Sequence, residues 1–117
     1  MDITVSSHGL RFDSDTESFV RRQIQAALQR FEEQVVAVDV FLKDINGPKG
    51  GIDKQALVRV RLRNRQVITT EIARTGLRAA VVVSVRKAKR AVRRSLKKSL
   101  LRHRWRVRTG RGEVTGS

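Results

Sequence analysis

Apolar residues recur along the N-terminal half of the chain with two periods, which predict a strand followed by a helix. Isoleucine and valine alternate with polar residues over 2–7, as in a short strand with one buried face. Ser14 and Glu17 have the spacing of a capping box, so we expect a helix to begin there and to span roughly 16–33. Its apolar residues recur at helical spacing: Val20, Ile24, Ala27, Leu28 and Phe31.

Three further strands are predicted between this helix and a second one. Residues 35–43 are rich in β-branched and aromatic side chains, and 44–51 contain the Asn-Gly, Gly-Pro and Gly-Gly pairs of a loop. Strict alternation follows over 56–63, with one apolar face and one arginine face, and a turn then leads into a strand over 66–73. The arginines of that face and turn are Arg59, Arg61, Arg63 and Arg65.

A second amphipathic helix is predicted over 77–101. Its apolar residues fall in one arc of the helical wheel: Leu77, Val81, Val85, Ala88, Val92 and Leu96. The opposite half carries only lysine and arginine: Arg86, Lys87, Lys89, Arg90, Arg93, Arg94, Lys97 and Lys98. Residues 102–117 contain three glycines and show no clear period, so we expect one domain over 1–101 and a flexible basic tail over 102–117.

The resulting order, β-α-β-β-β-α, predicts an α+β fold. A right-handed crossover through the first helix makes the first two strands parallel, and hairpins make the remaining neighbours antiparallel, which gives a four-stranded mixed sheet. Both helices have an apolar stripe to bury, so we expect them to pack on one face of the sheet. The basic half of the second helix then faces outward.

Charge is distributed unevenly over the 117 residues, whose net charge is +15. Residues 1–71 hold 11 basic and 10 acidic side chains, whereas residues 72–117 hold 15 basic side chains and one acidic, Glu113. This asymmetry indicates a polyanionic partner, either a nucleic acid or an anionic membrane. Ordinary solvated helix faces interleave acids with bases, so the acid-free face favours a nucleic acid, with a logarithmic salt slope of about −4 to −7 if roughly six to eight phosphates are contacted.

Other candidate contacts are weaker. The arginine face of the third strand is equally consistent with a solvated surface and with a second RNA surface. Lys49 and Lys54 are close enough to the glycine loop to reach phosphates, although a plain hairpin connection explains the loop, which lacks the spacing of a phosphate-binding motif. Trp105 fits base stacking and a surface position equally well, and the phenylalanines (Phe12, Phe19, Phe31 and Phe41) mostly occupy predicted core or core-edge positions.

Catalysis, metal binding and membrane insertion are not expected. The chain has no cysteine, His8 and His103 are far apart, and no nucleophile–base arrangement is evident, so we predict no enzyme activity, no cofactor and no small-molecule substrate. No apolar run is long enough to cross a bilayer, and no secretory signal is evident. We therefore expect a cytoplasmic protein that has no need to oligomerise.

The element order and several local motifs resemble the ribosome hibernation promoting factor family, which includes ribosome-associated inhibitor A. The resemblance covers residues 1–101 and includes the opening Asp-Ile-Thr-Val-Ser-Ser-His, Phe19-Val20, the segment 46–54 and Ala79-Ala80-Val81. It implies a fold like the double-stranded-RNA-binding domain. It also implies a partner, the small ribosomal subunit, where family members occupy the decoding channel, exclude messenger RNA and A- and P-site transfer RNA, and silence translation under stress.

The resemblance also assigns roles to individual residues. Lys87, Arg90 and Arg94 fall where the family commonly has basic residues, so the RNA-contact role is carried to them. The chain departs from the pattern at four positions: Arg78 replaces an aromatic, Val82 an acid, and Gln23 and Ala26 first-helix lysines. Secondary RNA contacts are then expected from Arg21, Arg22, Lys49, Lys54 and Arg78.

The length of the chain fits a short member without the C-terminal domain that pairs ribosomes. Two other functions fit the residues. General nucleic-acid binding follows from charge alone, and regulation of an alternative sigma factor follows from a historical description of the family.

Overall fold

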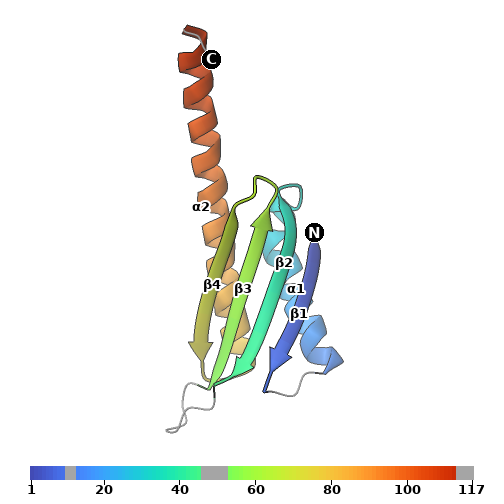
Figure 1. The fold of residues 1–117 in the computed structure, drawn as a ribbon. Coiled ribbons are helices and arrows are strands. Elements are labelled where there is room, and N and C mark those ends of the chain that lie inside the picture. The colour runs from blue at the N-terminus through green and yellow to red at the C-terminus, as the bar shows by residue number, and fades with distance from the viewer. Residues whose placement is uncertain (10–12, 46–52, 113–117) are drawn as a thin grey trace.

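Seven elements of secondary structure make up the described part of the chain. The computed structural model describes residues 1–9, 13–45 and 53–112, with side chains described as far as residue 98. The predicted order of strands and α-helices is confirmed, with a short 3-10 helix added after the first α-helix (Figure 1). In chain order the elements are β1 (Asp2–His8), α1 (Ser14–Leu28), η1 (Gln29–Phe31), β2 (Val35–Asp44), β3 (Lys54–Leu62), β4 (Val67–Arg74) and α2 (Leu77–Gly112).

The four strands form one mixed sheet in the order β1-β2-β3-β4, as predicted. β1 and β2 are parallel because α1 carries the chain back across the sheet between them. β2 and β3, and likewise β3 and β4, are antiparallel neighbours. In Figure 1 both helices lie behind the sheet, α1 behind β1 and β2 and α2 behind β3 and β4. One face of the sheet is thus covered by helices and the other is open.

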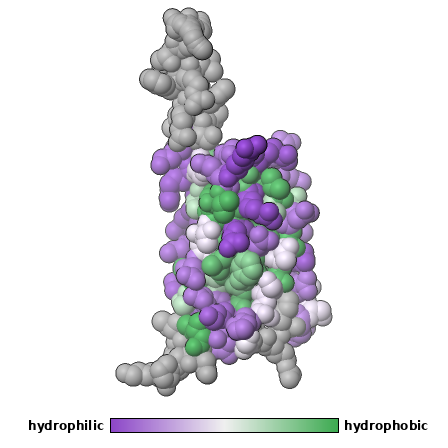
Figure 2. Space-filling model, in the orientation of Figure 1, coloured by the Kyte–Doolittle hydropathy of each residue, from purple (hydrophilic) through white to green (hydrophobic). Residues whose placement is uncertain are grey.

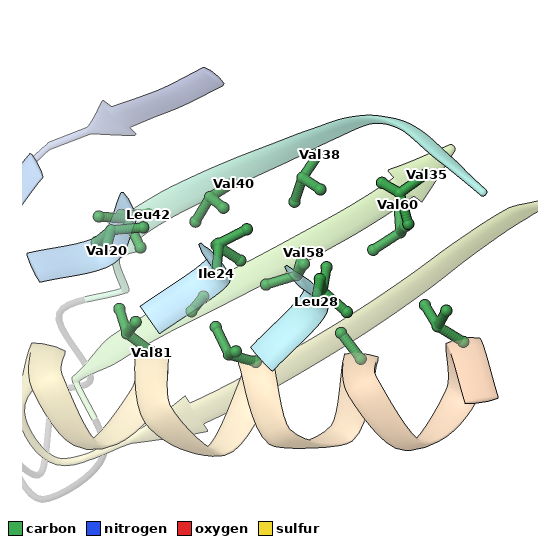
Figure 3. Packing of buried hydrophobic residues seen from close by; sticks show 14 of the residues in the cluster. Val20, Ile24, Leu28, Val35, Val38, Val40, Leu42, Val58, Val60 and Val81 are labelled. Atoms are coloured by element: carbon green, nitrogen blue, oxygen red, sulfur yellow. The ribbon is translucent and has the colours of Figure 1, made fainter. Parts of the chain in front are cut away.

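The core lies between the covered face and the two helices. Alternation along β3 shows how the strands contribute to it, because Val58 and Val60 are fully buried while Arg59 between them is exposed. Each such valine contributes about 1.5–3 kcal/mol by leaving water. In Figure 3 side chains of α1, β2, β3 and α2 point into this common layer, among them Val20, Ile24, Leu28, Val38, Val40, Val58 and Val81.

The ends of α1 differ from the sequence prediction. Asp13, and not Ser14, caps the helix, since its Oδ1 accepts a hydrogen bond of 2.8 Å from the backbone N–H of Thr16. This contact with the charged form lowers the pKa of Asp13. The predicted capping box at Ser14 is therefore wrong. The predicted end at residue 33 is wrong too, because α1 ends at Leu28 and the tighter η1 turn follows before β2 begins.

The end of α2 also differs from the prediction. The helix was expected to end near residue 101, but it continues to Gly112 and extends beyond the end of the sheet (Figure 1). The extension does not require apolar residues at helical spacing, because a helix that has nucleated adds one backbone hydrogen bond for each further residue. The chain from 102 to 109 contains neither glycine nor proline to stop it. The expected tail is therefore helical as far as Gly112, and residues 113–117 lie outside the described residues.

Two polar contacts fix the position of α2 against the sheet. Ser84 is fully buried where the helix meets the sheet, and its Oγ lies 3.4 Å from the carbonyl oxygen of Ala56 on β3. Thr70 of β4 donates to the carbonyl oxygen of Ser84 at 3.2 Å. Before the helix begins, Gly76 adopts a φ of +92° and donates its N–H to Asp53 at 3.3 Å. No helix in the described part of the chain has the length and hydropathy needed to span a membrane.

Candidate nucleic-acid interface

The basic residues predicted on the second helix form one surface of α2, which we call the basic face. All of them are exposed except Lys89, which is half-buried beside α1. Alanine and valine residues of the same helix, such as Ala88 and Val92, are buried against the sheet. The core therefore holds the helix in a fixed orientation and presents the cations to solvent. The residues of the basic face are Arg86, Lys87, Lys89, Arg90, Arg93, Arg94, Lys97 and Lys98.

No acid neutralises the basic face. The sequence of α2 contains neither aspartate nor glutamate. Among the described side chains, no ion pair involves a residue of the basic face. Like charges three or four positions apart on a helix destabilise it by about 0.2–0.5 kcal/mol for each pair. A bound polyanion would remove this repulsion, so the arrangement favours a nucleic acid as partner.

A shallow groove of about 270 Å³ separates the basic face from α1. Arg86 and Lys89 line it from α2, and Gln23 and Ala26 line it from α1. These are the two α1 positions at which the resemblance led us to expect lysines. In this chain the positive charge that lines the groove therefore comes from α2 alone. The sequence did not predict the groove, because it depends on how the two helices pack side by side.

The secondary candidates on the helices have different surroundings. Arg22 is exposed, whereas Arg21 is engaged in an ion pair with Glu17 at 2.9 Å. Arg21 also donates to the carbonyl oxygen of Ile3 at 2.9 Å, so it ties α1 to β1. Arg78 is exposed at the start of α2, with its guanidinium carbon 4.3 Å from the centroid of the Phe19 ring. Arg22 and Arg78 thus remain available to a ligand, and Arg21 has a structural role.

Lys54 lies in a cluster of charges at the start of β3. Its Nζ is 3.0 Å from Asp53 and 3.8 Å from Asp44, and the hydrogen bond to Asp53 raises the pKa of Lys54. The same hydrogen bond, together with the N–H of Gly76, lowers the pKa of Asp53. Lys54 is therefore already paired with carboxylates and is a poor phosphate ligand. Lys49 falls outside the described residues.

The arginines of β3 point away from the basic face, on the open side of the sheet. Arg61 pairs with Asp39 at 3.6 Å, and Arg63 at the end of the strand donates to the carbonyl oxygen of Glu33 at 2.8 Å. The guanidinium carbon of Arg59 lies 5.5 Å from the centroid of the Phe41 ring. These arginines form a surface separate from the basic face, and Figure 2 shows that hydrophobic and hydrophilic residues are mixed there.

Phe41 is an exception among the phenylalanines. Most of them were expected at core or core-edge positions, but Phe41 is 41% exposed on the open side of the sheet. The alternation along β2 already predicted that Phe41 is exposed. Val38, Val40 and Leu42 are buried, and adjacent side chains of a strand point to opposite faces of the sheet. An exposed aromatic near a cation is a feature of nucleic-acid-binding surfaces, and the sequence prediction overlooked it.

Other chemistry has little support in the described residues. Among them, no group of three or more histidine, aspartate or glutamate side chains is close enough to hold a metal ion. His8 is exposed at the end of β1. The side chains of His103 and Trp105 fall outside the described ones, so the predicted alternatives for Trp105 stay open.

Comparison with known proteins yields a family match and structural neighbours. Residues 3–99 match the sequence profile of the family described as Sigma 54 modulation protein / S30EA ribosomal protein, which confirms the family expected from the local motifs. No curated protein matches the chain in sequence.

Two solved structures share the fold. The Thermus thermophilus Protein Y N-terminal domain is 21% identical with a TM-score of 0.67, over 80% of this chain and 98% of that chain. A ribosomal subunit interface protein from Coxiella burnetii is 11% identical with a TM-score of 0.69, over 83% of this chain and 99% of that chain.

Proposed function

Because the chain belongs to the family of Sigma 54 modulation and S30EA ribosomal proteins, we propose that it binds the small ribosomal subunit and inhibits translation. The basic face of α2 contacts ribosomal RNA in the decoding channel, and the bound protein excludes messenger RNA and the A- and P-site transfer RNAs. One observation carries the proposal: half of α2 is an outward row of cations without an acid, and the other half is fixed in the core.

The basic face suits RNA that is read by shape and backbone charge. Over 77–98 the helix is about 33 Å long. It carries no aromatic side chain in this stretch, so the stacking of splayed bases is not available to the basic face itself. Lysine and arginine side chains spread along a rigid rod match phosphates spread along a folded RNA. Ribosomal RNA is a partner of this kind.

Reversal of charge at three exposed positions of the basic face tests the proposal. The variant Lys87→Glu, Arg90→Glu, Arg94→Glu should lose co-sedimentation with purified small subunits at physiological salt, because three attractions become repulsions. Its circular dichroism should match that of the unchanged protein, since all three side chains face solvent. Unchanged co-sedimentation of a folded variant would refute the assignment of this surface.

A matched control separates the basic face from total charge. The variant Arg30→Glu, Arg63→Glu, Arg65→Glu alters the net charge by the same amount at exposed positions outside α2. It should retain binding to small subunits apart from a modest effect of its lower net charge. If both variants lost binding equally, general charge and not the basic face would govern association.

Occupation of the decoding channel is tested by competition. The protein should reduce the binding of transfer RNA to small subunits programmed with messenger RNA, in proportion to the fraction of subunits it occupies. Stable binding of the protein without any loss of transfer RNA would contradict the channel and leave a different site on the subunit. Equal affinity for duplex DNA and for small subunits would instead favour general nucleic-acid binding.

The family description supports a second candidate, because its first part names sigma-54 modulation. In that case an acidic protein surface would meet the basic face. A sigma factor captured by the protein after complete nuclease treatment, with no ribosomal protein present, would support this candidate over the first.

A further inference from the structure

The open side of the sheet carries an exposed aromatic ring in a shallow depression. We call the side that faces away from α1 and α2 the open face. Phe41 lies on β2, with Ser6 opposite it on β1 and Leu57 opposite it on β3. The depression measures about 250 Å³ and is also lined by His8, Lys43, Gln55 and Glu71. Figure 2 shows this face, where hydrophobic residues lie among hydrophilic ones.

Two cations lie close to the ring, one on β2 and one on β3. Lys43 follows Phe41 by two residues and is exposed on the same face. Arg59 is paired in register with Asp39, two residues before Phe41, and its guanidinium carbon lies 5.5 Å from the ring centroid. Residues two apart in a strand are about 6.7 Å apart. Lys43 therefore lies to one side of the Phe41 ring along β2, and the guanidinium of Arg59 reaches over the ring from β3.

These cations are not engaged by carboxylates. Among the described side chains, neither Lys43 nor Arg59 takes part in an ion pair. Two acids lie nearby: Asp39 pairs with Arg61 at 3.6 Å, and Glu71, opposite Leu57 on β4, lines the side of the depression away from β2. An anion is thus attracted to both ends of the Phe41 ring and repelled from the β4 side.

We propose that the open face binds single-stranded RNA, with one base stacked on Phe41 and the flanking phosphates on Lys43 and Arg59. In the register of the sheet the two cations are about 13 Å apart, so each can meet a phosphate on its own side of the stacked nucleotide. Leu57 provides an apolar floor beside the ring, and Gln55 and Ser6 offer hydrogen-bonding groups to the edge of the base. Aromatic side chains on a four-stranded sheet bind unpaired bases in this way because every base has a stacking surface.

A protein partner fits the open face less well. A stable protein interface buries about 800 Å² on each side around an apolar centre. Here the apolar centre is limited to Phe41 and Leu57, and charged residues follow directly on both sides. An isolated ring between two cations matches one nucleotide better than it matches a protein surface.

The site is independent of the proposed binding to the small subunit. α2 lies on the covered side of the sheet (Figure 1). Phe41 is exposed on the open side, so each surface can be altered without the other. The experiment uses the full chain with Lys87→Glu, Arg90→Glu and Arg94→Glu, which removes the attraction of the basic face. An unstructured heptaribonucleotide is titrated into this isotopically labelled protein, and the backbone amides are followed by nuclear magnetic resonance.

The shifts should concentrate on the part of β2 and β3 around Phe41 and Leu57. A duplex RNA of equal length should compete at least tenfold more weakly, because its bases are not free to stack. Shifts confined to α2, no shifts at all, or equal competition by duplex RNA would overturn the proposal. The loss of small-subunit binding by this triple variant tests the basic face and says nothing about the open face.

Substitutions of the ring separate stacking from simple apolar contact. Phe41→Leu keeps an apolar side chain but removes the aromatic surface, and it should weaken binding by about tenfold, as expected for the loss of one stacked base. Phe41→Tyr keeps that surface and should stay within about twofold of the parent. Val67→Ala, an exposed position at the edge strand β4, is the matched control and should change nothing. Unweakened binding by a folded Phe41→Leu variant, or equal losses with leucine and tyrosine, would overturn the proposal.

Discussion

The dependence of binding on salt offers the sharpest test of the basic face, because it counts phosphate contacts. The perturbation is the replacement of Lys87, Arg90 and Arg94 by alanine, first singly and then together. Alanine removes one cation at each position without adding an acid, and all three side chains are exposed, so the core is unaffected. Affinity for purified small subunits is then measured over a series of potassium chloride concentrations.

The expected salt dependence of binding follows from the number of cations on the basic face. The basic face holds seven exposed cations and the half-buried Lys89. Each neutralised phosphate contributes about 0.7–0.9 to the slope of log affinity against log salt, so roughly six to eight contacts predict a slope of about −4 to −7. A fourfold rise in salt should then weaken binding by about 250-fold to 16,000-fold. Each single alanine should make the slope shallower by about 0.7–0.9, and the triple variant by about 2–3.

The control is the triple alanine variant at Arg30, Arg63 and Arg65, which lowers net charge equally outside α2. Its slope should stay close to that of the unchanged protein, because these side chains meet no phosphate in the proposed complex. The reasoning is refuted if the triple variant of the basic face changes the slope by less than about one unit. It is also refuted if the control variant changes the slope as much.

Three further predictions concern stability, each measured by chemical denaturation. Val92→Ala should lower the free energy of unfolding by about 1–3 kcal/mol because it opens space in the core, whereas the exposed Val36→Ala should stay within about 0.5 kcal/mol. Ser84→Val should cost about 1–3 kcal/mol, since a larger side chain replaces a buried hydroxyl between helix and sheet; an equally stable variant would mean that this contact is loose. The pKa of Asp53 is lowered in the folded protein. Its charged form therefore adds to the free energy of unfolding at pH values above the ordinary carboxyl pKa of 3.8, and this stabilisation is lost as the pH falls through the folded-state pKa. Asp53→Asn should therefore destabilise the protein at pH 7, with the difference shrinking in acid; a difference that is independent of pH would point away from the charge pair with Lys54.

Much of the fold could be predicted because it depends on local periodicity. The alternation of Val58 and Val60 with Arg59 and Arg61 identifies a strand with two unlike faces, since successive side chains of a strand point in opposite directions. The basic face was found in the same way, since a period of 3.6 residues separates cations from the apolar stripe of α2. These inferences need only neighbours in the sequence, and the structure agrees with them.

Helix ends were predicted less well because several adjacent residues compete for the same role. Asp13 and Ser14 both suit an N-cap, and only the backbone geometry selects Asp13. α2 continues past residue 101 because backbone hydrogen bonds sustain it where the apolar period ends.

The sequence by itself determined the order of the elements, the two-sided character of α2 and the concentration of positive charge toward the C-terminus. Only the tertiary structure decided which cations remain available to a ligand. Lys54 and Arg21 are engaged by groups that the fold brings to them, whereas Arg59 lies over Phe41 on a face that no helix covers. The physical reason is that ion pairs, stacking and exposure depend on distances between segments, which the local period of a sequence does not contain.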